Sequence, residues 1–180
     1  DWSDGVLTAA RTDLDVTANI TVTANFAINT YTLTYAAGLN GSITGSSPQT
    51  VEHGSSGTPV TAVPDTGYHF VDWSDGSTAN PRTDTNVTAD LSVTANFALE
   101  YYALTITRAG SGTGTVTSVP GTISCGATCV GSFAHGTVVS LTAVPSSTSS
   151  FAGWNGDYTG TDNPLTITMD GPKNLQATFT

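Results

Sequence analysis

We expect an all-β protein: a row of small tandem β domains with little or no helix, arranged as an extended rod. Three observations predict this fold class. Only 10% of the 180 residues are charged, against about 25% in an ordinary domain, and strand- and turn-favouring Thr, Ser and Gly take their place. Apolar and polar residues alternate with a period of two in several segments. One sequence unit also recurs along the chain.

The repeated unit sets the domain boundaries. Residues 1–27 and 72–98 are identical at 17 of 27 positions without a gap. Tyr31 and Tyr102 open the corresponding segments YTLT and YALT, and TAVP occurs once in each of the two later units. The predicted domains are the C-terminal half of a repeat over residues 1–29, a complete repeat over 30–99, and a complete repeat with a Cys-containing insertion over 100–180.

Alternation predicts the strands in each unit. Every second residue from Leu91 to Phe97 is apolar, which is typical of a strand with one buried face. The same pattern predicts strands over residues 20–26, 31–35, 139–143 and 175–179. Residues 165–179 predict a hairpin that turns at Asp170-Gly171-Pro172.

Large aromatic residues recur at fixed places in the unit and are the candidate structural core. A tryptophan at one repeated position suits a core plug better than a platform for sugar stacking, and a phenylalanine precedes it in both complete units. Tyr101 and Tyr158 are the better candidates for exposed rings. The predicted core aromatics are Trp2, Trp73, Trp154, Phe70, Phe151, Phe26, Phe97 and Phe179.

The two cysteines, Cys125 and Cys129, predict a disulfide in an oxidising compartment. The three residues between them form a short Gly-containing loop, which is able to bring two strand ends within bonding distance. The alternatives fit less well, because a structural metal site needs four ligands and a redox pair usually has C-x-x-C spacing.

The order of motifs in the two complete units is specific. The last unit contains GTVVSLTAVP (136–145), FAGWNG (151–156) and NPLTITMD (163–170), and the middle unit contains GTPVTAVP (57–64) and FVDWSDG (70–76). This series resembles the divergent internalin-B-type B-repeat family, with Asp72 where the family usually has glycine. The resemblance implies a small, mainly β domain related to the β-grasp shape. It also implies tandem use as a spacer, stalk or adhesive module on secreted or surface-anchored bacterial proteins.

Charge limits the partners. The net charge of −10 repels phosphate backbones, so a nucleic-acid partner is not expected. No apolar run approaches the roughly 20 residues of a membrane helix, so membrane insertion is not expected. A calcium site is a weaker hypothesis, because the last unit has Gly153 and Gly156 where the middle unit has two of its acids. The acids concerned are Asp72, Asp75 and Asp84, with Asp4 and Asp13 in the first copy.

Catalysis is not predicted. His53 and His135 each precede a glycine at a turn, and no nucleophile can be paired with them from the sequence. The glycine-rich AGSGTGTV (109–116) lacks the Lys-Ser/Thr and the helix of a phosphate-binding loop and predicts a turn. The expectation is therefore a protein with no catalytic residue, no cofactor and no metal.

The function expected is a non-catalytic extracellular stalk, spacer or adhesive module of a bacterial surface or secreted protein. The alternatives are a subunit of a self-assembling filament and a carbohydrate-binding module appended to an enzyme. Expected partners are neighbouring repeats of the same or another chain, with a host or matrix protein or a glycan as candidate ligands. The half repeat leaves two explanations open: residues upstream complete it, or another chain does.

Overall fold

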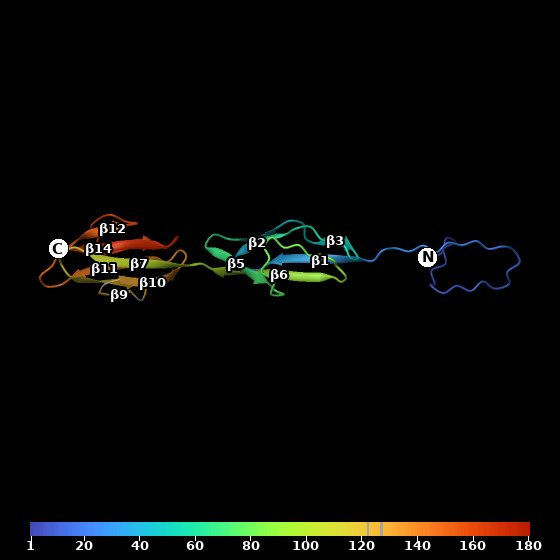
Figure 1. The fold of residues 1–180 in the computed structure, drawn as a ribbon, viewed down its shortest axis with the longest axis horizontal. Helices are drawn as coiled ribbons and strands as arrows, with labels where there is room; N and C mark the ends of the chain where they lie inside the picture. Colours follow the sequence, from blue (N-terminus) through green and yellow to red (C-terminus); the bar gives the residue numbers. More distant parts are fainter. Residues whose placement is uncertain (122, 127) are drawn as a thin grey trace.

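The computed structural model describes residues 1–121, 123–126 and 128–180, the side chains of Cys125 and Thr128 excepted. This part of the chain is all-β, with several sheets and no helix (Figure 1), and so has no helix long and apolar enough to cross a membrane. The strands are β1 (Thr30–Ala37), β2 (Gly41–Thr44), β3 (Gln49–Glu52), β4 (Thr61–Pro64), β5 (Tyr68–Trp73), β6 (Leu91–Leu99), β7 (Tyr101–Ala109), β8 (Gly114–Val119), β9 (Ser124–Cys125), β10 (Thr128–Ala134), β11 (Val138–Pro145), β12 (Phe151–Gly156), β13 (Leu165–Thr168) and β14 (Lys173–Phe179).

The two complete units share one topology. In the middle unit the strand order is β3-β1-β6-β5, with β2 and β4 as a second, two-stranded sheet. In the last unit the order is β10-β7-β14-β12, and the second sheet is β13-β11-β8-β9. Corresponding strands keep the same register: Tyr35 pairs with Val93 in the middle unit, and Ile106 pairs with Leu175 in the last. The repeat in the sequence is therefore a repeat of structure.

The first and last strands of each unit pair in parallel. β1 runs beside β6 over Leu33–Ala37 and Leu91–Ala95, and β7 runs beside β14 over Leu104–Ala109 and Lys173–Thr178. The other pairings within the units are antiparallel, including β1 with β3 and β5 with β6. In a parallel pair both strands point the same way, so the chain enters a unit at one end of the sheet and leaves it at the other.

Each unit has its own hydrophobic core, built from both of its sheets. The middle core includes Leu33 from β1, Val60 beside β4 and Trp73 from β5, each 0% exposed. The last core includes Trp154, Phe179 and Leu141, exposed by at most 1%. Phe70, Phe97 and Phe151 are partly buried against these cores.

Residues 1–27 correct two of the predictions. The strand expected over residues 20–26 does not form: the pairing here is a single bridge between Trp2 and Ala24. Phe26, a predicted core residue, is 93% exposed. Both differences have one cause, because residues 1–27 correspond to 72–98, which include only the last two residues of β5 and no part of β1 to β4. In the middle unit these strands supply the pairing partner of β6 and cover Phe97.

The hairpin predicted over residues 165–179 is also wrong. β13 pairs with β11 in one sheet, and β14 pairs with β7 and β12 in the other. The turn at Asp170-Gly171-Pro172 carries the chain from one sheet to the other. It directly follows Met169, which is buried in the core. The alternation that suggested a hairpin arises because each strand has its own buried face.

Candidate functional site

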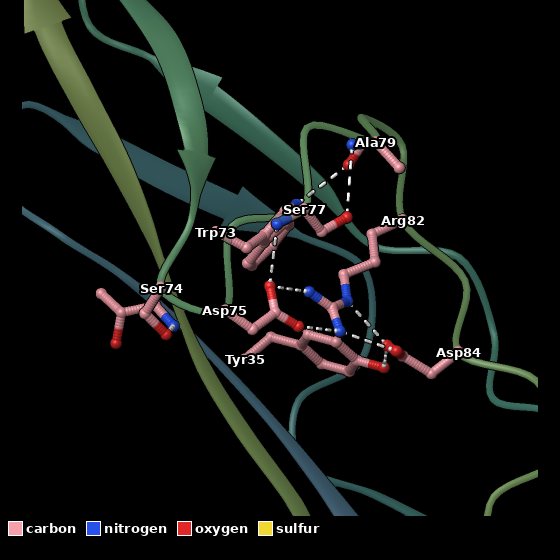
Figure 2. A network of polar contacts seen from close by, with 9 residues as sticks. Tyr35, Trp73, Ser74, Asp75, Ser77, Ala79, Arg82 and Asp84 are labelled. Carbon is pink, nitrogen blue, oxygen red and sulfur yellow. Dashed lines mark hydrogen bonds and ion pairs between the residues drawn. The ribbon is translucent and has the colours of Figure 1, made fainter.

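The densest polar cluster among the described side chains lies in the middle unit, at the edge of its core. Figure 2 shows the Arg82 guanidinium between the carboxylates of Asp75 and Asp84, with the Tyr35 hydroxyl on Asp84. Arg82 comes from the segment after β5, Tyr35 from β1 and Asp75 from the turn after Trp73. Three parts of the unit that are distant in sequence therefore meet at one buried cation.

The geometry of this Arg82 cluster is tight. Arg82 donates from Nε and Nη2 to the two oxygens of Asp84, at 2.8 and 2.7 Å, a bidentate pairing. Its Nη1 donates to Asp75 Oδ1 at 2.9 Å, and Tyr35 Oη donates to Asp84 Oδ2 at 2.7 Å. The guanidinium also lies over the Trp73 ring, with Cζ 5.5 Å from the ring centroid. Only 7% of the Arg82 side chain is exposed.

The electrostatics of the cluster oppose proton transfer near neutral pH. Hydrogen bonds from Arg82 hold the pKa of Asp84 and the pKa of Asp75 below the usual range for aspartate. Burial, and then the hydrogen bond to Asp84, raises the pKa of Tyr35. The carboxylates stay charged and the phenol stays protonated, so the groups attract one another across the neutral range. The Arg82 cluster fixes the loop after Trp73. The indole Nε1 of Trp73 also donates to Ala79 O in this loop, at 2.9 Å.

Residues 1–27 contain a copy of this cluster. Arg11 binds Asp13 and Asp4, as Arg82 binds Asp84 and Asp75, and its Cζ lies 5.7 Å from the Trp2 ring centroid. Trp2 Nε1 donates to Thr8 O at 3.0 Å, matching the bond from Trp73. The loop and its arginine therefore take the same geometry where the rest of the unit is absent.

The last unit fills the same place with apolar side chains. Counted from the Asn-Pro step of each unit, Arg82 corresponds to Leu165 and Asp84 to Ile167, and Tyr35 corresponds to Ile106. Leu165 is 2% exposed and Ile106 is 0% exposed. The same fold position is thus occupied by an ion pair in one repeat and by aliphatic residues in the other, which indicates a packing role for the Arg82 cluster.

The structure separates the acids grouped by the calcium hypothesis. Asp75 and Asp84 both bind Arg82, whereas Asp72 accepts a hydrogen bond from Asn96 at 2.8 Å on the exposed face of β5. Within residues 1–121, 123–126 and 128–180, no group of three His, Cys, Asp or Glu is placed to hold a metal ion.

The predicted aromatic and histidine residues fall into two groups. Trp73 and Trp154 are buried, so neither presents a face for sugar stacking. Tyr158 is half-buried against the last core and donates to Asp162 at 2.6 Å, whereas Tyr101 is 63% exposed. His53 and His135 each pack against a tyrosine, Tyr31 or Tyr102, at the same end of their units.

The disulfide prediction involves the side chain of Cys125, which lies outside the described part of the chain. Cys129 is in the core cluster of the last unit, and its backbone pairs with Ile106 of β7. The backbone of Cys125 pairs with Val116 of β8, in the other sheet of that unit. The disulfide stays a prediction.

Sequence reasoning missed two polar residues that join separate segments within the middle unit, Arg82 and Asn80. The signal for the arginine is Arg-Thr-Asp, which occurs at Arg11 and again at Arg82 in a chain with only four basic residues. Asn80 accepts from Ala62 N and donates to Ala62 O, at 2.9 and 2.8 Å, and Asn163 does the same with Ala143. The Asn-Pro motif was visible, but its hydrogen-bonding partner was not.

Comparison with known families decides the assignment. The sequence model of the divergent InlB B-repeat domain matches residues 31–100 and 102–180. The chain belongs to the divergent InlB B-repeat family. No curated protein and no solved structure matches the chain. The family match confirms the resemblance drawn from the motifs.

The two matched B-repeats coincide with the two structural units. The first match spans β1 to β6 and the second spans β7 to β14. Each B-repeat therefore contains one complete core, formed by the strands from its first to its last. Tandem B-repeats of this family are consistent with a repeat region of a bacterial surface protein, and the Arg82 cluster belongs to the packing of one repeat.

Proposed function

We propose that these B-repeats form a non-catalytic, load-bearing spacer, extended as a rod, in an extracellular or surface protein of a bacterium. The observation that carries this proposal is the parallel pairing of the first and last strands in both repeats. A pull on the two ends of a repeat slides these strands along each other. The force then runs along the strands and across the hydrogen bonds of the parallel ladder, so these bonds are loaded together and not one after another.

Several features support the extended form. One residue, Glu100, separates β6 from β7, so the chain passes almost directly from one repeat into the next. In Figure 1 the repeats follow one another along the long axis. The chain has only four Lys and Arg residues, so it offers few cleavage sites to trypsin-like proteases, which suits an exposed stalk. The relation of the repeats to the β-grasp shape stays an expectation from the family.

The absence of catalysis is part of the same proposal. The buried polar cluster of the middle repeat has an apolar equivalent in the last repeat. Groups that bind or transform a ligand in every repeat would need the same side chains in each. A spacer needs a closed core in each repeat, and the separate cores of the two repeats support this role.

Single-molecule pulling in two geometries tests the proposal. In the first, force is applied through the two ends of the middle repeat. In the second, handles sit at Thr66 and Glu100, which lie at the same end of the sheet because Tyr68 pairs with Leu99. We expect a higher unfolding force in the first geometry, because the second opens the antiparallel β5–β6 pair bond by bond. Equal forces, or a weaker end-to-end geometry, would remove the mechanical argument.

A self-assembling filament is the second candidate, and one observation favours it. Residues 1–27 expose Leu7, Leu14 and Phe26, each by more than 80%. Uncovered apolar groups of this kind attract strands of a neighbouring repeat. Fibres in negative-stain images of the purified chain that disappear in the Phe26→Ser variant would support the filament, whereas discrete short particles in both proteins would favour the spacer.

A further inference from the structure

The junction between the two complete repeats contains contacts beyond the covalent chain. Glu100 N donates to Gly67 O at 2.7 Å, and His135 N donates to Glu100 O at 2.8 Å. His69 Nδ1 of the middle repeat lies 3.4 Å from Glu100 Oε1. The turn before β5, the connecting residue and the turn after β10 are therefore tied together at one point.

A packing contact across this junction joins the His135 side chain to Gly67. The imidazole of His135 packs on the α-carbon of Gly67, where a side chain would overlap the ring. Gly67 is the third residue of a four-residue turn closed by the bond from Tyr68 N to Asp65 O, and its φ is +83°. A turn with positive φ at this position requires glycine. The turn geometry and the space for the histidine therefore depend on the same residue.

The His135 ring also packs inside its own repeat. Its centroid lies 5.9 Å from that of the Tyr102 ring in an edge-on arrangement. Its Nδ1 is buried without a hydrogen-bond partner among the described residues. The ring thus contacts both repeats through packing and not through a side-chain hydrogen bond.

The middle repeat contains the same histidine without the neighbour. His53 N donates to Asn29 O at 2.8 Å, as His135 N donates to Glu100 O, and the His53 ring centroid lies 5.8 Å from that of Tyr31. Among the described residues no turn of another repeat covers His53, and its side chain is exposed. The chain therefore holds one histidine engaged between repeats and a matched histidine that is not.

We propose that His135 seated on Gly67 is a lock that fixes the orientation of the last repeat relative to the middle one. This inference rests on the proposed spacer function and names the contact that makes the spacer stiff. Without the lock, the backbone bonds of Glu100 and its contact with His69 are left to oppose rotation of one repeat against the other, and such a rotation disturbs neither core. With it, rotation drives the imidazole into the backbone of the turn at Gly67.

Residual dipolar couplings of the isotope-labelled whole chain test this lock. Residues 30–99 and 101–180 of the wild-type protein are expected to share one alignment tensor. His135→Ala should give two different tensors, with each repeat still fitting its own structure. His53→Ala is the matched control and should keep the single tensor, because it removes the same ring where no repeat is docked.

A glycine pair provides a second, independent arm. Gly67→Ala places a methyl group against His135, whereas Gly76→Ala introduces the same strain at φ +84° with no atom within 4 Å of the new methyl. We expect Gly67→Ala to split the tensor and Gly76→Ala to leave it shared. If His135→Ala and Gly67→Ala both keep one tensor, the lock is wrong and the spacer proposal survives. Two tensors already in the wild type would overturn the stiff rod itself.

Discussion

Arg82 occupies a position where the two repeats use opposite chemistry. Its charge is satisfied by Asp84 and Asp75 and is shielded by Trp73. The corresponding aliphatic residues of the last repeat fill the space without any charge. Replacing a whole buried ion pair by apolar residues is often neutral, whereas removing one partner is costly. The middle repeat therefore shows the ion pair, and the last repeat shows its apolar replacement at the same position.

Arg82→Leu should lower the free energy of unfolding of the middle repeat by about 3 kcal/mol, because it leaves the carboxylate of Asp84 without its cation. This is the lower end of the range for buried pairs, since 21% of the Asp84 side chain is exposed. Arg82→Leu combined with Asp84→Ile copies the last repeat at these two positions, with Tyr35 kept, and should recover most of the loss. Native-state hydrogen exchange measures each repeat separately.

Arg11→Leu is the matched control for this pair of variants. It makes the same change in the copy of the cluster outside the middle repeat and should leave exchange in residues 30–99 unchanged. A double variant that is no more stable than Arg82→Leu alone would contradict the packing role of the cluster.

Acid should weaken the middle repeat more than the last one. The folded pKa of Asp84 lies below its unfolded value of about 3.9, because Arg82 stabilises the carboxylate. Its contribution is therefore fully present above about pH 5 and is lost as the pH falls through the folded pKa. Denaturant unfolding between pH 6 and pH 2, followed by amide signals of each repeat, measures this. An equal acid loss in the Arg82→Leu, Asp84→Ile variant would show that other groups dominate.

At this scale the sequence indicates the arginine of the cluster but not its distant partner Tyr35. Arg11 and Arg82 stand out because arginines are rare and both occur in Arg-Thr-Asp. Tyr35 lies 49 positions from Asp84, and the folded repeat pairs the two through the Tyr35 hydroxyl. That pairing depends on the closed fold, so no local pattern indicates it.

At the scale of elements, Asn80 and Asn163 join the segment after the tryptophan loop to β4 and β11. Asn163→Ala should destabilise the last repeat by about 2 kcal/mol, since it leaves the N–H and C=O of the buried Ala143 unpaired. Asn155→Ala removes an exposed 3.4 Å contact to Thr178 and should change stability by less than about 0.5 kcal/mol. Hydrogen exchange at Ala143 reports the difference, and similar effects of both variants would argue against the bracing role of Asn163.

Gly114, the first residue of β8, lets an aromatic ring lie against the backbone. A Cβ on Gly114 would overlap the ring of Phe179, so Gly114→Ala should destabilise the last repeat by about 1–3 kcal/mol. Gly171→Ala is the control, because no atom lies within 4 Å of its new methyl. Thermal unfolding of both variants tests this account, and an unchanged melting temperature for Gly114→Ala would contradict it.

Part of the strands was predictable, but their partners were not. Alternation located β1, β6, β11, β13 and β14, since each of these strands buries one face, and it did not indicate the remaining strands. It misplaced β13 and β14 as a hairpin, because period-2 alternation records a buried face and says nothing about which sheet the strand joins. It also failed over residues 20–26, where the apolar pattern is present but the covering strands are absent.

At the scale of the whole molecule, the two repeats are joined in series, so a force on the ends of the chain passes through each repeat in turn. Each repeat receives the chain on its first strand and releases it from the neighbouring last strand, and Glu100 links the two repeats. Separate cores mean that one repeat can fail while the other holds. Tandem repetition was readable from the sequence, whereas the parallel pairing of the terminal strands required the fold.

A force–extension trace of the whole chain, pulled from its two ends, tests the central claim most directly. The account predicts two separate unfolding steps, one per B-repeat (31–100 and 102–180), which lengthen the chain by about 25 and 28 nm at roughly 3.6 Å per residue, less the end-to-end length of the folded repeat. A single step that releases both repeats together, or a smooth extension without steps, would contradict independent load-bearing repeats.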